Sequence, residues 1–124
     1  GSLLPAQAYE KAVRLRHLIR HQVLEALNTY AVLALPMSAK TAQPIEDDPV
    51  ITSKATAACA PYLFTRFFNL AGVPAISVPC GFNTEGLPIG LQLGGRMGDE
   101  TTVLRVAYAY EQHTSWHRQR PTAN

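Results

Sequence analysis

The sequence has 124 residues, of which 47% are hydrophobic and 16% are charged, with a net charge of +2. This length and composition fit one globular domain over residues 1–124, and so weak a positive charge excludes a nucleic-acid-binding surface. Apolar runs are too short to span a membrane, and no signal-peptide pattern opens the chain, so no membrane partner is expected. Cys59 and Cys80 make no disulfide framework, and we expect both to stay unpaired in a reducing, cytoplasmic compartment.

The N-terminal region is predicted to be a long helix over residues 5–30. Gly1-Ser2 lacks an initiator Met and is interpreted as a cloning remnant, so we expect the chain to be a cut piece of a longer protein. Arg16 and Arg20 fall on the apolar side of this helix. Their guanidinium groups either reach solvent over an apolar surface or form a buried ion pair. The first alternative is favoured for Arg20, and Arg16 is left open.

The middle of the chain contains a strand, a loop and a short helix in the prediction. Residues 32–35 are a continuous apolar run ending at Pro36, which predicts a strand buried on both faces. Residues 37–60 lose apolar periodicity and are predicted to be a loop-rich insertion. Residues 62–71 are predicted to form a helix closed by Gly72 as its C-cap.

The stretch from residue 69 to 95 carries the fold prediction. Its two apolar runs, residues 75–79 and 89–93, are joined by a short segment rich in turn-forming residues, which predicts an antiparallel hairpin. A helix over residues 100–113 follows, with Asp99 as its N-cap. Its packing face is expected to contain Val103, Val106, Ala107 and Tyr110. The predicted class is therefore α/β, with a few mixed strands and a central hairpin flanked by helices.

Few residues in this chain could carry chemistry themselves. No serine lies in a glycine-rich elbow, and Cys80 at a strand end is the best-placed nucleophile, although a small buried hydrophobic residue is the commoner role for such a cysteine. His17 and His21, like His113 and His117, have helical spacing, but neither pair has a carboxylate or cysteine that would complete a metal site. We therefore expect no metal and no cofactor.

Two segments resemble the C-terminal part of the amidase signature family. They read FTRFFNLAGVPAISVPCGFNTEGLPIGLQLGG over residues 64–95 and DETTVLRVAYAYEQ over residues 99–112, with the elements in the family's order and spacing. The resemblance implies a C-terminal fragment of the amidase signature fold. It also implies a hydrolase that cleaves carboxamide C–N bonds of a small-molecule amide by a Ser–cis-Ser–Lys mechanism, whose catalytic residues lie outside this chain.

The resemblance further implies that this fragment forms one wall of the substrate pocket. The candidate wall residues are Met37, Tyr62, Thr65, Arg66 and Asn69, each of which could equally be ordinary packing. Tyr62 falls where the tRNA-amidotransferase members of the family tend to carry an Asp associated with glutamine recognition. An aromatic side chain cannot pair with an ammonium group as a carboxylate does, which favours a general amidase.

Two other functions stay open from the sequence. One is the A subunit of a glutamyl-tRNA(Gln)/aspartyl-tRNA(Asn) amidotransferase, and the other is a non-catalytic interaction domain that keeps half of the fold. In each case a homodimer is expected, because a piece of a larger enzyme leaves apolar edges and faces uncovered. The surfaces expected to be exposed are residues 32–35, the edge of residues 89–93, and the helix face around Leu24 and Leu27.

Overall fold

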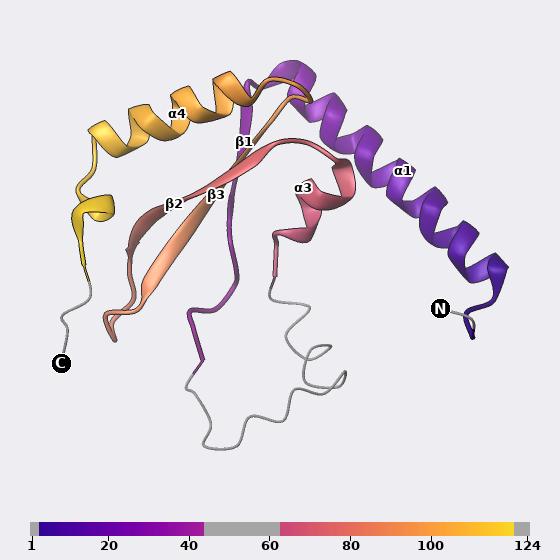
Figure 1. The fold of residues 1–124 in the computed structure, drawn as a ribbon, viewed down its shortest axis with the longest axis horizontal. Coiled ribbons are helices and arrows are strands. Elements are labelled where there is room, and N and C mark those ends of the chain that lie inside the picture. Colours follow the sequence, from indigo (N-terminus) through magenta and orange to yellow (C-terminus); the bar gives the residue numbers. More distant parts are fainter. Residues whose placement is uncertain (1–2, 44–62, 121–124) are drawn as a thin grey trace.

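A computed structural model of the chain describes residues 3–43 and 63–120 (Figure 1). Residues 44–62, which include Cys59 and Tyr62, lie outside the described part, as does most of the loop-rich insertion. In chain order the elements are α1 (Ala6–Thr29), β1 (Val32–Pro36), α3 (Arg66–Ala71), β2 (Ala75–Phe82), β3 (Pro88–Gly95), α4 (Glu100–Gln112) and the 3-10 turn η2 (Trp116–Arg118). No described helix is long and apolar enough to cross a membrane.

The strands form one three-stranded sheet in the order β1-β3-β2. The predicted hairpin is confirmed: β2 and β3 pair antiparallel, with a register shift between Pro79 and Gly81. The side chain of Asn83 holds the turn, because its Oδ1 accepts hydrogen bonds from the backbone N–H groups of Glu85 at 3.0 Å and Leu87 at 2.8 Å. The prediction of mixed strands differs from the described sheet: β1 and β2 run parallel to each other, but β3 separates them, so every pair is antiparallel.

The positions of the strands in the sheet correct two expectations. The prediction that β1 is buried on both faces is wrong, because Ala34 and Pro36 are exposed and β1 pairs only with β3 among the described strands. The prediction of an exposed edge at residues 89–93 is also wrong, since β3 is the central strand and both of its edges are paired. Sequence patterns alone did not show which strand would take the centre.

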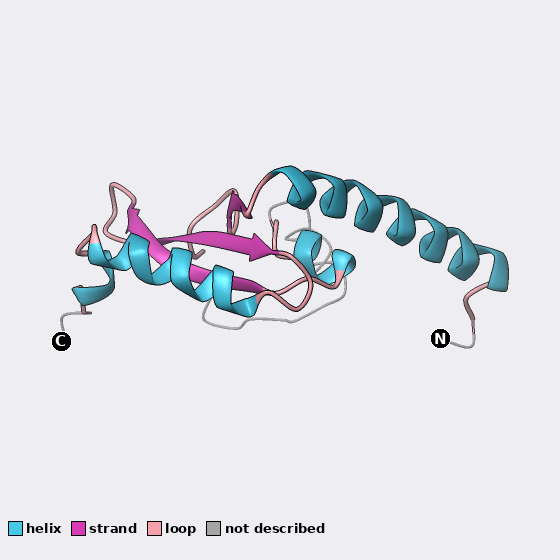
Figure 2. Cartoon of the chain, turned by 90° about the horizontal axis from the view of Figure 1, so that it is seen from above, coloured by secondary structure: helices cyan, strands magenta, loops and turns pink. Residues whose placement is uncertain are grey.

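Helix α4 covers one face of the sheet (Figure 2). Its predicted cap is confirmed, because Asp99 Oδ1 accepts a hydrogen bond from the backbone N–H of Thr102 at 3.2 Å. The predicted packing face is confirmed as well. Ala107 is buried in one cluster with Val78 and Leu93 of the sheet, Val103 is also buried, and Val106 and Tyr110 pack against that cluster.

Helix α3 and the C-terminal end of α1 lie on the opposite side of the sheet from α4 (Figure 1). The predicted C-cap of α3 is confirmed, since Gly72 has φ +68° and therefore the left-handed conformation that favours glycine. Val23, Leu27 and Ala71 form the buried cluster between the two helices. The expectation that the face around Leu24 and Leu27 is exposed is therefore wrong, because Leu27 is only 1% exposed and Leu24 is half-buried.

The N-terminal half of α1 projects away from the rest of the molecule (Figures 1 and 2). The predicted helix over residues 5–30 is confirmed over residues 6–29, but only its second half packs. Val23 and Leu27 are its buried residues, whereas Tyr9, Leu15 and Leu18 are all more than half exposed. Tyr9 lies on the same side of α1 as Leu27, so the apolar side of the helix continues beyond the surface that the described chain covers, whereas Leu18 lies on the opposite side.

Three arginines cap the C-terminal ends of two helices. Arg16 Nε donates to Leu70 O at 3.1 Å, and Arg20 Nη1 donates to Ala71 O, both at the end of α3. Arg96 Nε donates to Leu27 O near the end of α1 at 2.7 Å. Neither alternative proposed for Arg16 and Arg20 is the observed one, since both bind main-chain carbonyls that a helix end leaves unpaired.

Candidate substrate-pocket wall

Two backbone contacts bring Met37 next to the start of α3. Ser38 and Leu63 form an antiparallel bridge, and Phe64 N donates to Met37 O at 3.1 Å. The chain is therefore extended at Leu63, which explains why α3 begins at Arg66 and not at residue 62 as predicted. These contacts bring together the described chain on either side of residues 44–62 and place Met37 beside the start of α3, which carries Arg66 and Asn69 and is preceded by Thr65.

The wall residues of α3 face away from the sheet. Phe68 and Ala71 are the buried residues of this helix, whereas Arg66 and Asn69 are exposed and lie three positions apart, on one side of the helix. Thr65 is half-buried at the N-cap position, without a side-chain capping bond. The structure thus places Arg66 and Asn69 on one short helix and Thr65 directly before it, while Tyr62 lies outside the described residues.

Helix α3 sits very close to the sheet because Gly94 of β3 has no side chain. An ideal Cβ on Gly94 would lie 2.3 Å from Cε1 of Phe68, far inside contact distance. Phe68 is 1% exposed, so its ring occupies the space that any larger residue at position 94 would need. A glycine at this strand position therefore sets the distance between the predicted wall and the sheet.

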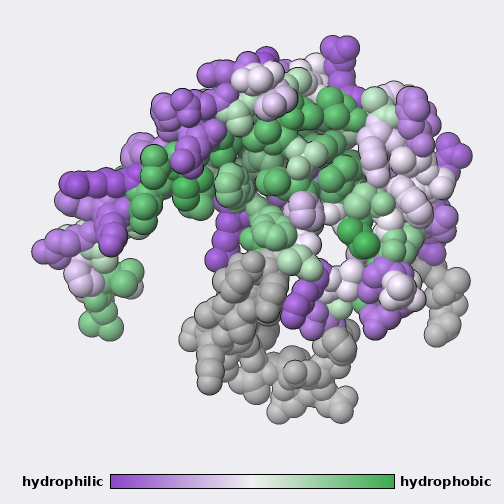
Figure 3. Space-filling view, turned by 180° about the vertical axis from the view of Figure 1, so that it is seen from behind, coloured by the Kyte–Doolittle hydropathy of each residue, from purple (hydrophilic) through white to green (hydrophobic). Residues whose placement is uncertain are grey.

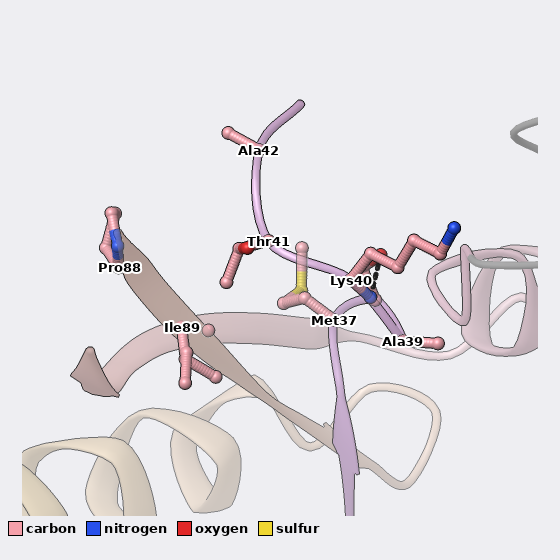
Figure 4. Close-up of a pocket in the computed structure, with 9 residues that line it drawn as sticks. Met37, Ala39, Lys40, Thr41, Ala42, Pro88 and Ile89 are labelled. Atoms are coloured by element: carbon pink, nitrogen blue, oxygen red, sulfur yellow. Dashed lines mark hydrogen bonds between the residues drawn. The ribbon is translucent and has the colours of Figure 1, made fainter. Parts of the chain in front are cut away.

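A hollow of about 270 Å³ lies beside Met37, lined by residues 37–42 and 88–90 (Figure 4). Met37 N donates to Gly90 O at 3.0 Å, which extends the pairing of β1 and β3 by one residue. Thr41 Oγ1 accepts a hydrogen bond from Asn83 Nδ2 at 3.1 Å, which ties the far side of the hollow to the hairpin turn. The lining of this hollow combines apolar side chains, such as Met37, Pro88 and Ile89, with the polar residues Ser38, Lys40 and Thr41.

The described residues do not assemble a nucleophile with a base. Cys80 is a half-buried free thiol, and its Sγ donates to Ile89 O at 3.5 Å, so no described base contacts it. Cys80 is unpaired as predicted, while Cys59 is not described. Within residues 3–43 and 63–120, no three His, Cys, Asp or Glu side chains lie together as a metal site would need. The described residues therefore supply no group that could attack a substrate.

Gln92, which was not among the predicted site residues, is 4% exposed and is the buried polar residue of the described chain. Its Nε2 is shielded from solvent and has no hydrogen-bond partner. The signal was present in the sequence, because a glutamine interrupts the apolar run of β3 between Leu91 and Leu93. The alternation of a strand would have placed Gln92 opposite the face that α4 covers.

Comparison with known proteins gives the same family from sequence and from structure. Residues 2–104 match the family model described as Amidase. The A subunit of glutamyl-tRNA(Gln) amidotransferase from Oceanobacillus iheyensis is 46% identical over 113 residues, which cover 91% of this chain and 22% of that protein. The crystal structure of the corresponding Thermotoga maritima protein superposes with a TM-score of 0.75 at 34% identity, over 91% of this chain and 24% of that one.

A hydrolase shows the same fold. The structure of 6-aminohexanoate cyclic dimer hydrolase has a TM-score of 0.74 at 25% identity, over 98% of this chain and 27% of that one. This chain spans about a quarter of the length of these relatives. The family model, by contrast, covers most of the present chain. The chain therefore belongs to the amidase signature family.

Proposed function

We propose that this chain is the C-terminal part of a hydrolase that cleaves the C–N bond of a small carboxamide. The observation that carries the proposal is the match to the amidase family over residues 2–104, in a fold that brings Met37 beside α3. The Ser–cis-Ser–Lys residues of such an enzyme would lie outside this chain. The role of the chain is then to complete the sheet and to supply one wall of the pocket.

The chemistry of the exposed side of α3 supports a role in substrate positioning. Arg66 offers guanidinium donors and Asn69 offers both a donor and an acceptor, on the same side of one helix. A carboxamide presents a carbonyl acceptor and an N–H donor, so these two side chains are complementary to it. Thr65 adds a hydroxyl at the end of the helix nearest Met37.

A second candidate is the A subunit of a tRNA-dependent amidotransferase, which would act in a complex. It is favoured by the identity of 46% to a protein of that name. Tyr62 argues for the free amidase, because a neutral aromatic side chain cannot form the ion pair that a carboxylate forms with the ammonium group of glutamine. The two candidates share the bond that is cleaved and differ in the amide that is bound.

The test is a chimera in which this chain replaces the matching quarter of the O. iheyensis amidotransferase protein. We expect the folded chimera to release ammonia from simple carboxamides, with Arg66→Ala and Asn69→Ala raising KM more than they lower kcat. Activity on glutamine that exceeds activity on simple amides would support the amidotransferase candidate. A chimera that folds but hydrolyses no amide, beside an active parent enzyme, would refute the proposal and favour the interaction domain.

We further propose that the isolated chain forms a two-fold homodimer. The outer edge of β1 has no partner strand among the described residues, and apolar side chains gather in the middle of the face seen in Figure 3. Unpaired edges and exposed apolar patches recruit partners. Leu15 and Leu18, which are 51% and 56% exposed, add apolar surface on α1. Light scattering should give twice the chain mass, and a concentration-independent mass near 13.5 kDa would exclude the dimer.

We place the protein in the cytoplasm. The support is the free thiol of Cys80, which fits a reducing compartment. Fractionation of cells that make the tagged full-length protein tests this, and recovery in a secreted or membrane fraction would contradict it.

A further inference from the structure

A second hollow lies between the β2–β3 hairpin and the turn η2, and we call it the η2 hollow. Its volume is about 470 Å³, and its lining includes Pro79, Phe82, Pro88, Trp116 and Arg120. Among the described residues it shares only Pro88 with the hollow beside Met37. The η2 hollow thus combines aromatic and proline side chains with one cation.

The β-bulge of β2 explains how two residues three positions apart line the same hollow. The register of β2 and β3 shifts between Pro79 and Gly81. Pro79 lies opposite Gly90 of β3, and Phe82 lies opposite Pro88, two positions before Gly90. Because residues two apart on a strand share a face, Pro79 and Phe82 lie on one face together with Pro88. In a strand without the extra residue they would point to opposite faces.

The indole of Trp116 supplies the apolar surface on the η2 side. Its ring meets the Phe82 ring edge to face, with ring centroids 6.1 Å apart and an interplanar angle of 63°. The pair does not use up the surface of either ring, because Trp116 is 37% and Phe82 is 40% exposed. Aromatic and proline side chains lose little conformational freedom when a ligand binds, so this surface suits a flat apolar group.

Arg120 brings a positive charge to the hollow. Its Nη1 donates to the main-chain carbonyls of His117 at 3.1 Å and Gln119 at 3.4 Å, whereas Nε and Nη2 donate to no described residue. The ion pairs of the described residues both lie on α1, so none of them neutralises Arg120. Glu85, in the nearby hairpin turn, accepts a hydrogen bond from Asn83 Nδ2 at 3.4 Å instead. The Nε and Nη2 donors of a guanidinium point the same way and match the two oxygens of a carboxylate.

We propose that the η2 hollow binds a small aromatic carboxylate. The carboxylate accepts hydrogen bonds from Nε and Nη2 of Arg120, and the aromatic ring packs against Phe82 and Trp116. The volume of the hollow falls within the range of about 300–1,000 Å³ that is typical of small-molecule sites. An inorganic anion would leave the rings uncovered, and a neutral hydrocarbon would leave the guanidinium unpaired.

His117 also lines the hollow but is given no ligand contact. Its Nδ1 is shielded from solvent, and its Nε2 accepts a hydrogen bond from Arg118 Nε at 3.4 Å. Recognition of the anion therefore falls to Arg120. Hydrolysis of an aromatic carboxamide, the proposed reaction, would release an acid of this class, but the binding inferred here does not depend on that reaction.

The first measurement follows the indole N–H resonance of Trp116, which is the only tryptophan of the chain. Titration of naphthoate into the isotope-labelled chain should shift this resonance to saturation. Two matched probes separate the parts of the ligand: acetylnaphthalene is a neutral ketone of similar shape, and acetate is a carboxylate without a ring. Each should bind at least about fivefold more weakly than naphthoate. An unchanged resonance with naphthoate, or equal binding of either probe, would overturn the inference.

The second measurement assigns the anion contact to Arg120. Arg120→Gln should weaken naphthoate binding at least about fivefold and leave acetylnaphthalene binding unchanged. The matched control is Arg105→Gln, because Arg105 is exposed on α4, lines no part of the η2 hollow and carries the same charge. This control should bind naphthoate as wild type does. Equal losses in the two variants would show attraction to a basic protein in general and would overturn the inference.

A third variant tests the aromatic contact. Phe82→Leu keeps an apolar side chain of similar size but removes the ring, so it should weaken the binding of naphthoate and of acetylnaphthalene alike. Amide resonances of α1, which lies outside the hollow, should stay in place in all variants and show that each one folds. Full affinity for naphthoate in the folded Phe82→Leu variant would mean that the ring contact is wrong and would overturn the inference.

Discussion

Replacing Gly94 with alanine should loosen the contact between α3 and the sheet. The new Cβ would lie 2.3 Å from Cε1 and 2.4 Å from Cζ of Phe68. Either the Phe68 ring or the backbone of β3 must therefore move. Because Phe68 is 1% exposed, its ring has no free space to enter. Overpacking of this kind costs about 1–3 kcal/mol, and we expect a value of about 2–3 kcal/mol here. Each kcal/mol would lower the melting temperature by roughly 4 °C.

Urea unfolding followed by circular dichroism measures this loss. Gly90→Ala is the matched control, because the atom it meets is Cγ of Met37 at 2.8 Å, part of a flexible side chain that can give way. The double variant Phe68→Leu/Gly94→Ala should lose about 1 kcal/mol less free energy of unfolding than the sum of the two single variants. The smaller leucine leaves room for the new methyl group. If Gly94→Ala costs no more than Gly90→Ala, or if the double variant is additive, Phe68 is not the obstacle.

Three further predictions concern separate features of the chain. Asp99→Ala should lower the free energy of unfolding by about 1 kcal/mol, because it removes the acceptor of the Thr102 N–H, and Asp99→Asn should retain most of it. The chain alone should release only background product from an anilide or a primary carboxamide, and turnover abolished by Cys80→Ala would show that this thiol is a nucleophile after all. Titration of denatured, unreduced protein should count two thiols, Cys59 and Cys80, and a count of zero at unchanged mass would reveal a bridge between them.

Features set by near neighbours in the sequence could be predicted. The hairpin, the N-cap at Asp99 and the C-cap at Gly72 each depend on a few adjacent residues with known turn and capping preferences. The packing face of α4 followed from its helical spacing. These predictions needed no knowledge of which elements meet in space.

Features set by long-range pairing could not be predicted in the same way. Whether a strand is central depends on which strands pair with it. Residues 89–93 contain no signal that β1 pairs with the edge of β3 that β2 leaves unpaired. Arg20 lies on the apolar side of α1 because it donates a hydrogen bond to Ala71 O at the end of α3. This contact depends on how the two helices pack, which the sequence does not show. Gln92 is the same case, since its burial depends on what covers β3. The wall residues came from the family resemblance, and their role is still a prediction.

The pairing of β1 with β3 has a consequence for how the chain folds. Val32 pairs with Gly95, so this contact closes a loop that contains all of the undescribed segment, α3 and the hairpin itself. The β2–β3 hairpin closes through a few residues, and loops of greater length cost more entropy to close. We therefore expect the hairpin and α4 to form early and β1 to join last, which pulsed hydrogen exchange would detect as late protection of β1. Late arrival of β1 would leave one edge of β3 unpaired during folding, and that transient edge is where two chains could first exchange strands.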